Sequence, residues 1–309
     1  MRVIDSHVHF PSEKIIDTGG ADRPEGKAAG ASMPGAPAPA NPWLIEEKEK
    51  WKRAWRFPPE EKLDTEESIR RWKAECDSHD FLKNVVFVTA GDNEFAAELA
   101  EKDGRFIGYA HHDPLLPDAA DRLEKALGSL RLRGYKLLGP QIDVPLNDKR
   151  FYPLWEIAQA REVPVLIHFG ILGGAGGIAN HININPLVIH DVAKDFPRLP
   201  IIIPHFGCGY VFETLNLCWA CPNVCIDTSG SNQWMRWMPY ELNLEILFRK
   251  YRETIGAGRI LFGTDSSWFP RGFTDAYLDE QIRAMVYVGY SADELDRVLY
   301  SNAASLLKL

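Results

Sequence analysis

Short apolar runs alternate with longer helix-type segments along most of this 309-residue chain. The runs are rich in β-branched and aromatic residues, and several helix-type segments begin with Asp, Asn or Pro, as helices commonly do. About eight such runs follow one another, at 3–9, 84–90, 105–110, 133–138, 163–168, 200–205, 223–229 and 259–265. Helices are expected between them, for example at 92–102, 118–127, 153–161, 186–195 and 240–251. This alternation predicts a parallel sheet built from strand–helix units.

Two observations favour a closed sheet over an open one. Runs that are almost entirely apolar, such as VVFV and IIIP, indicate strands buried on both faces, which either an open or a closed parallel sheet provides. About eight units are present, and polar residues from both ends of the chain can form one site only if the first and last strands lie side by side. We therefore expect an α/β fold, a (β/α)8 TIM barrel that occupies residues 1–309 as a single domain.

A long insertion is expected after the first strand, over residues 19–56. Its first part, residues 19–42, is rich in Gly, Ala and Pro and lacks the side chains that a core needs. The next stretch is helix-like and carries Trp43, Trp51 and Trp55. These tryptophans either pack on the barrel or on a second subunit, or they belong to a lid over the active site.

The composition restricts the partners and the compartment. A formal net charge of −8 argues against binding to nucleic acid or to an anionic membrane, because either surface attracts cationic proteins. The opening residues MRVIDSHVHF carry charges where a secretory signal needs an apolar stretch, and no run resembles a membrane span. Five cysteines, an odd number, suit a reducing compartment. The expectation is a cytoplasmic protein that acts on a small molecule.

Side chains of the metal-binding type follow several of the predicted strands. His7 and His9 are two residues apart, so both leave the same face of a strand. His168, His205 and Asp265 end later runs, and the carboxyl ends of barrel strands meet at one face. One such histidine alone is usually a hydrogen-bonded core residue, but an ordered set at strand ends predicts a metal site. Imidazole and carboxylate ligands suit a catalytic Zn²⁺ with an open position for water, and Mn²⁺ or Fe²⁺ are alternatives.

The runs that carry this pattern, IDSHVHF, IHFG, PHFG and GTD, resemble the amidohydrolase superfamily. They are most similar to its amidohydrolase-related branch, which includes aminocarboxymuconate-semialdehyde decarboxylase, and RFIGYAHHDP and RGYKLLGPQI resemble the third and fourth strands of that branch. Residues 19–55 lie outside the resemblance. The resemblance implies a homodimer in which His205 is the acid–base group and one divalent metal is bound by His7, His9, His168 and Asp265.

The chemistry of these residues assigns roles that agree with the resemblance. A bound ion would lower the pKa of a water molecule and polarise a substrate oxygen. A neutral His205 can take up a proton and return it, and Asp265 either shares this transfer or only binds the metal. Hydrolysis of a small carboxylated substrate by metal-activated water is the first expectation. The alternatives are nonoxidative decarboxylation of an aromatic or muconate-type acid and an inactive barrel that only binds its ligand.

Substrate recognition is expected from cationic and aromatic side chains in loops. Arg236 and Arg271 suit a carboxylate, as does Arg56, and Trp234 and Trp237 are expected to form an apolar wall.

Three further sets of residues have more than one interpretation. Lys136, on the fourth strand, is expected to meet an anionic substrate, and the alternatives are an ion pair inside the barrel or a carboxylated lysine that bridges two metals, as in other members of the superfamily. His111 and His112 either line the pocket or form an ordinary loop pair. The cysteines at 208, 218, 221 and 225 are expected to be small buried hydrophobes rather than metal ligands.

Overall fold

The structure, a computed structural model, describes residues 1–10, 46, 61, 63–89, 91–171 and 180–309. Eight strands form one sheet in sequence order, and each strand is parallel to the next. The strands are β1 (Val3–His9), β2 (Leu82–Val88), β3 (Phe106–His111), β4 (Tyr135–Leu138), β5 (Val165–His168), β6 (Ile201–Ile203), β7 (Val224–Asp227) and β8 (Ile260–Leu261). All eight overlap the runs predicted from the sequence.

The sheet closes where its first strand meets the chain that follows β8. The amide of Ser6 donates to the carbonyl of Phe262 at 3.0 Å, and the amide of Asp265 donates to the carbonyl of His7 at 2.8 Å. The amide of His9 donates to the carbonyl of Ser266 at 2.8 Å, next to a parallel bridge between Val8 and Ser266. These bonds complete the barrel, so the predicted TIM barrel is confirmed.

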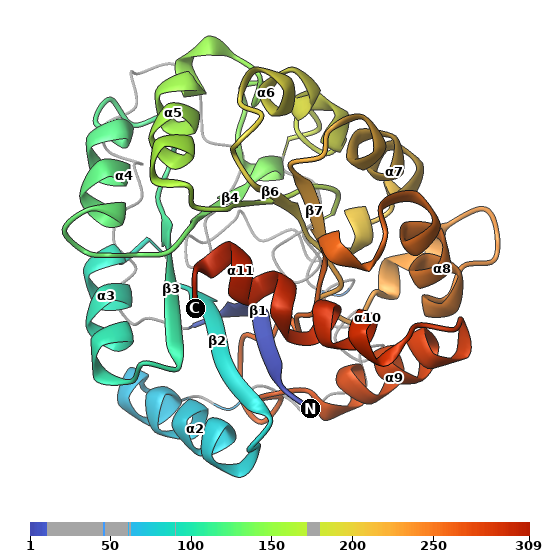
Figure 1. Cartoon of the computed structure of the whole chain (residues 1–309). Helices are drawn as coiled ribbons and strands as arrows, with labels where there is room; N and C mark the ends of the chain where they lie inside the picture. The colour runs from blue at the N-terminus through green and yellow to red at the C-terminus, as the bar shows by residue number, and fades with distance from the viewer. Residues whose placement is uncertain (11–45, 47–60, 62, 90, 172–179) are drawn as a thin grey trace.

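Helices surround the barrel in a ring (Figure 1). They are α2 (Thr65–Ser78), α3 (Asn93–Lys102), α4 (Ala119–Leu127), α5 (Tyr152–Arg161), α6 (His190–Asp195), α7 (Val211–Ala220), α8 (Leu244–Ile255), α9 (Asp275–Tyr287), α10 (Ala292–Asp296) and α11 (Asn302–Leu307). The helix expected at 240–251 begins later because the side chain of Asn243 caps it, accepting from the amide of Ile246 at 2.9 Å. The segment expected at 186–195 divides into a 3₁₀ turn, Pro186–Ile189, and α6.

Side chains on the strands alternate between an outer core under the helices and an inner core inside the barrel. The inner core contains Ile4, Val86, Val88, Ile107, Tyr109, Leu166, Ile202, Cys225 and Leu261. Ala303, Ala304 and Leu307 of α11 pack against this inner core. Helix α11 therefore covers one end of the barrel, and it crosses the centre of the view in Figure 1.

The structure tests some of the remaining sequence predictions and leaves others outside the described residues. The insertion at 19–56 lies outside the described residues except for Glu46, and so do Trp43, Trp51, Trp55 and Arg56. Among the described helices, none combines the length and apolar character needed to cross a membrane. All five cysteines are free and buried, and burial raises the pKa of Cys218 to about 12, as expected for small core residues.

Asn183 joins two loops at the end of the barrel where the strands finish. Its side chain is fully buried; Oδ1 accepts from the amide of Leu146 at 3.0 Å, and Nδ2 donates to the carbonyls of Ile142 and Val144 at 2.9 and 2.8 Å. We expect Asn183→Ala to lower the free energy of unfolding by about 2–3 kcal/mol, because buried backbone groups lose their partners. Urea unfolding measures this loss.

The neighbouring exposed His181 provides a matched control for this measurement. His181→Ala should change the free energy of unfolding by less than about 0.5 kcal/mol. An equally small change for Asn183→Ala would contradict the role given to its three hydrogen bonds.

Candidate metal centre

Two imidazoles and one carboxylate converge at the carboxyl end of β1. The Nε2 atoms of His7 and His9 are 3.2 Å apart. Oδ1 of Asp265 lies 3.3 Å from Nε2 of His9 and 3.7 Å from Nε2 of His7. The period of the strand puts both histidines on one side, and closure of the barrel brings Asp265 to them. We refer to these three residues as the His7/His9/Asp265 group.

The spacing of this group fits one divalent ion. Ligand atoms at about 2.0–2.2 Å from a common ion, with angles of about 90–115°, lie roughly 2.8–3.7 Å from one another. The three separations in the group fall within that range. Imidazole nitrogen and carboxylate oxygen are also the donor types that Zn²⁺, Mn²⁺ and Fe²⁺ accept. Three of the four predicted ligands therefore lie at a spacing that suits the predicted type of cofactor.

Asp227, the last residue of β7, fixes the orientation of His7. Its Oδ2 lies 3.0 Å from Nδ1 of His7, so the carboxylate accepts the Nδ1 proton and leaves the Nε2 lone pair for an ion. Its Oδ1 accepts from the amides of His205 and Ser229 at 3.1 and 2.9 Å, and from the Ser229 hydroxyl. His7, His205 and Asp227 are also close enough to share an ion, but these bonds already use both oxygens of Asp227. We therefore assign Asp227 to the support of His7.

Ser229 is a site residue that the sequence analysis missed. Its Oγ lies 3.0 Å from Nδ1 of His7 and 2.9 Å from Nδ1 of His205, and its hydroxyl donates to Asp227. The available signal was its position two residues after Asp227, which puts both on the same side of the extended chain. Ser229 thus contacts both histidines and the carboxylate of Asp227.

His205 lies directly beside His7, with its ring stacked on the His7 ring at a centroid distance of 5.3 Å. Its Nδ1 is 3.0 Å from the carbonyl oxygen of Ser229, and a carbonyl only accepts, so Nδ1 carries a proton. Its Nε2 then faces Nδ1 of His168 at 3.1 Å. The backbone thus holds one nitrogen of His205, and His168 contacts the other.

His168 reaches the same end of the barrel but contacts His205 rather than the His7/His9/Asp265 group. Its second nitrogen, Nε2, lies 3.1 Å from the carbonyl oxygen of Ile171. Within the described part of the chain, it is in neither set of side chains close enough to share an ion. Its role as a metal ligand stays a prediction.

The backbone is left-handed at two residues of the site. His205 has φ of 57° and Asp265 has φ of 54°. Such angles cost about 1–3 kcal/mol for a residue with a side chain and persist only where surrounding contacts impose them. The amide bond of Asp265 to the His7 carbonyl is one such contact. The turn after each strand thus directs a site residue to the barrel mouth.

Lys136 points into the barrel from β4 and contacts a residue of the group. It is 1% exposed, and its Nζ lies 3.1 Å from Nε2 of His7. Burial lowers the pKa of Lys136 to about 8, while the charges of Asp265 and Asp227 oppose that shift. The expected contact with an anionic substrate and the alternative bridging role both stay predictions. What the structure adds is direct contact with His7.

Burial prepares the charge states that a metal ion needs. It lowers the pKa of His7 to about 3, with a further contribution from the charge of Lys136. Burial alone would raise the pKa of Asp265, but His205, His9 and His7 hold it well below its usual value. Neutral imidazoles and an ionised carboxylate are the forms that bind metal ions.

Some of the residues expected to bind substrate are buried in the fold, and others are exposed. Arg271 donates to the carbonyl of Thr264 at 2.7 Å and lies 4.9 Å from the ring centroid of Trp268, so it supports the chain just before Asp265. Trp234 is buried, and its indole donates to Oδ1 of Asn232 at 3.1 Å. Arg236 and Trp237 are exposed on the turn Gln233–Trp237. Their roles in substrate binding stay predictions.

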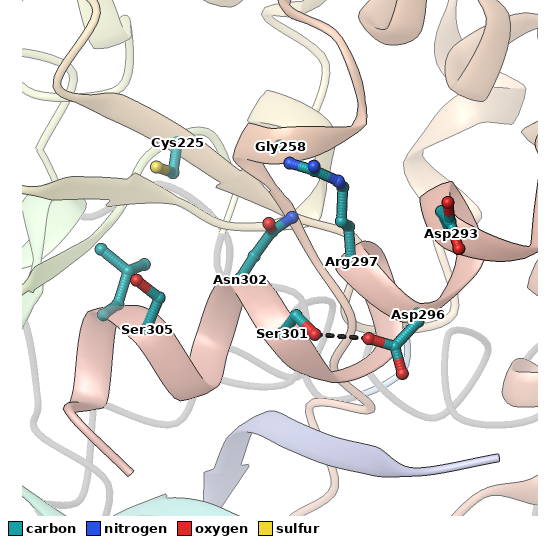
Figure 2. Close-up of a pocket in the computed structure, with 9 residues that line it drawn as sticks. Cys225, Gly258, Asp293, Asp296, Arg297, Ser301, Asn302 and Ser305 are labelled. Atoms are coloured by element: carbon teal, nitrogen blue, oxygen red, sulfur yellow. Dashed lines mark hydrogen bonds between the residues drawn. The ribbon is translucent and has the colours of Figure 1, made fainter.

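A separate pocket of about 810 Å³ lies where β7 and β8 begin, away from this centre (Figure 2). It is lined by Cys225, Gly258, Asp293, Asp296, Arg297, Ser301, Asn302, Ser305 and Leu306. Asp227 and Asp265, by contrast, come at or after the ends of the same two strands. The catalytic groups of TIM-barrel enzymes lie at the carboxyl ends of the strands, and this pocket lies at the opposite ends, so it is not the candidate site.

Solved structures with the same fold span almost the whole chain. One is 5-carboxyvanillate decarboxylase from Novosphingobium aromaticivorans, complexed with manganese and 4-hydroxy-3-methoxy-5-nitrobenzoic acid (14% identity, TM-score 0.63, covering 100% of this chain and 96% of that one). A second is 2,6-dihydroxybenzoate decarboxylase complexed with 2,6-dihydroxybenzoate (16% identity, TM-score 0.61, covering 100% and 99%). A third is a probable 2-pyrone-4,6-dicarboxylic acid hydrolase from Acinetobacter baumannii with citric acid bound (13% identity, TM-score 0.61, covering 100% of both).

Sequence comparison identifies the family of this chain. No curated protein matches the chain by sequence. The amidohydrolase family model, in contrast, matches residues 4–309, which includes every residue of the candidate centre. The resemblance seen in the histidine and aspartate motifs is thereby confirmed, and the chain belongs to the amidohydrolase family.

Proposed function

We propose that this chain is a metal-dependent decarboxylase of a small aromatic acid. The observation that carries the proposal is the His7/His9/Asp265 group at the carboxyl end of the barrel, the end that bears the active sites of TIM-barrel enzymes. Two of the structures that share the fold are named decarboxylases of hydroxylated aromatic acids. Their names support a small aromatic acid as the substrate class.

In this proposal, the group holds one divalent ion, Zn²⁺ or Mn²⁺, and His168 is its fourth protein ligand. Manganese is supported by its presence with the 5-carboxyvanillate decarboxylase. When bound, the ion supplies a positive centre that attracts substrate oxygens and stabilises the negative charge that develops on them. Asp227 and Ser229 keep the His7 ring in the orientation that this requires.

His205 is the group that we assign to proton transfer. In decarboxylation, the bond between the ring carbon and the carboxyl carbon breaks, CO₂ leaves, and the electron pair left on the ring carbon takes up a proton. The Nδ1 proton of His205 is held by the Ser229 carbonyl, so Nε2 is the atom that takes up a proton from solvent and delivers it to the ring carbon. Asp265 is proposed as a second group that shares this transfer.

Hydrolysis, the first expectation from the sequence, becomes the second candidate. It is supported by the shared fold with a probable pyrone hydrolase. His205 would then take a proton from the attacking water and pass it to the leaving oxygen. We rank decarboxylation first because two of the three structures compared above are decarboxylases. An inactive barrel is the third candidate.

Product analysis in D₂O tests this ranking. We expect the Mn²⁺- or Zn²⁺-loaded protein to release CO₂ from 2,6-dihydroxybenzoate or 5-carboxyvanillate and to place one deuterium on the ring carbon, because the proton comes from an exchangeable group. NMR of the product and a CO₂ assay measure both events. His205→Asn should lower kcat by about 10²-fold or more, the usual contribution of a positioned acid–base group.

The same preparation is given 2-pyrone-4,6-dicarboxylate in H₂¹⁸O as the comparison. Ring opening with ¹⁸O in the product, together with no CO₂ release from either aromatic acid, would replace decarboxylation by hydrolysis. Product formation of either kind would exclude the inactive barrel.

A further inference from the structure

His111 is the last residue of β3 and lies on the inner side of the barrel. Ile107 and Tyr109, two and four residues earlier, belong to the inner core, whereas Phe106 and Ala110 belong to the outer core. The period of the strand therefore directs His111 inward. It is paired in register with Lys136, whose amine contacts His7. The position is at the same end of the barrel as the candidate metal centre.

Two hydrogen bonds fix the backbone and one nitrogen of His111. Its amide donates to Oδ1 of Asn93 at 2.9 Å. Its Nδ1 lies 2.9 Å from the carbonyl oxygen of Lys136. A carbonyl only accepts, so the proton of the neutral ring is on Nδ1 and the lone pair is on Nε2. The tautomer is thus set by the backbone of the neighbouring strand.

The remaining nitrogen has no protein partner in the described part of the chain. His111 is 7% exposed, and the hydrogen bond of its ring to the Lys136 carbonyl uses Nδ1 and leaves Nε2. Burial lowers the pKa of His111 to about 4, so the ring is neutral near pH 7. His111 also belongs to neither set of described side chains that could share an ion. It presents a fixed, uncharged acceptor at the site.

We propose that His111 is a substrate-binding residue whose Nε2 accepts a hydrogen bond from a hydroxyl group of the substrate. An acceptor in this position favours a hydroxyl group at the point of contact over a carboxylate there, which would bring lone pairs against a lone pair. This assignment rests on the proposed function of the metal centre. It adds that the substrate needs a hydroxyl group as well as the carboxylate that reacts.

His112 is the matched neighbour that faces the other way. Its Nε2 lies 3.0 Å from the carbonyl oxygen of Ala119, and its ring lies 5.0 Å from the ring of Tyr135, which belongs to the outer core. His112 therefore supports the packing between barrel and helices. The same chemical change at 111 and at 112 separates recognition from folding.

Two substitutions at position 111 distinguish the role of Nε2 from the role of Nδ1. His111→Asn keeps an amide N–H near Nδ1, which can still donate to the Lys136 carbonyl, and removes the acceptor at Nε2. His111→Gln extends an amide to the position of Nε2 and restores an acceptor there. A merely structural histidine would be rescued by asparagine, whereas a substrate-binding histidine would be rescued by glutamine.

The experiment compares binding of two non-reacting probes by calorimetry with the Mn²⁺-loaded full chain. The probes are 4-hydroxy-3-methoxybenzoate, whose phenol keeps its proton near pH 7, and 3-methoxybenzoate, and they differ only in the hydroxyl group. Wild type should bind the hydroxylated probe roughly tenfold more tightly, the effect of one hydrogen bond in a buried site. In His111→Asn the ratio should fall to about one, and in His111→Gln and His112→Asn most of it should remain.

Each result decides between the assignments. A tenfold ratio that persists in His111→Asn, or equal binding of the two probes by wild type, would overturn the role of His111 and leave the metal centre standing. Failure of wild type to bind either probe would overturn the proposed function and this assignment with it. If His111→Asn unfolds, retention of the ratio by His111→Gln supports the assignment, and its loss overturns it.

Discussion

Replacing Asp265 with asparagine should lower kcat/KM by about 10³-fold or more. The amide has nearly the shape of the carboxylate but lacks its charge, so the group would lose its anionic ligand, and a bound divalent ion contributes several kcal/mol to catalysis. The measurements are the rate of CO₂ release and the metal content of the protein after dialysis. We expect both to fall together.

Asp279 is the control for this substitution, since it is an exposed carboxylate on α9. Asp279→Asn should leave the rate and the metal content unchanged within about twofold, as is usual for surface changes. An Asp265→Asn protein that keeps both its metal and its rate would remove Asp265 from the metal centre.

Substituting Asp227 with asparagine should weaken metal binding by about 10–100-fold, although Asp227 is not proposed as a ligand. The amide can donate to Nδ1 of His7, which would move the ring proton to Nε2 and block the lone pair that faces the group. A competition titration against a chelator at fixed pH measures the affinity for Zn²⁺ or Mn²⁺.

Ser229→Ala gives the graded comparison for this second prediction. It removes the hydroxyl that donates to Asp227 but leaves the carboxylate beside His7. Its loss of metal affinity should therefore be smaller than that of Asp227→Asn. Equal affinity in wild type and Asp227→Asn would mean that the carboxylate does not control the His7 ring.

The barrel and the core of its site were predictable because both follow from short-range patterns. A strand period of two puts His7 and His9 on one side, and a parallel barrel gathers the ends of its strands. Asp265 could be added because closure sets β8 beside β1. These statements depend on where a residue lies in its strand and not on how its side chain turns.

The contacts that the sequence could not provide depend on side-chain direction and on turns. The contact of the long Lys136 side chain with His7 was not among the predictions. His168 contacts His205 rather than the group, and the left-handed turn at His205 has no local signal such as glycine. Ser229 was missed because a serine after a strand is common. Each of these features is decided by three-dimensional packing.

The closure of the barrel between β1 and the segment after β8 has a consequence for biosynthesis. A ribosome makes His7 and His9 long before Asp265 and the residues that bond to β1. The two histidines must therefore remain without their carboxylate partner while the residues between β1 and β8 are made. The ion binding that we propose for the complete group would therefore follow release of the segment around Ser266 from the exit tunnel.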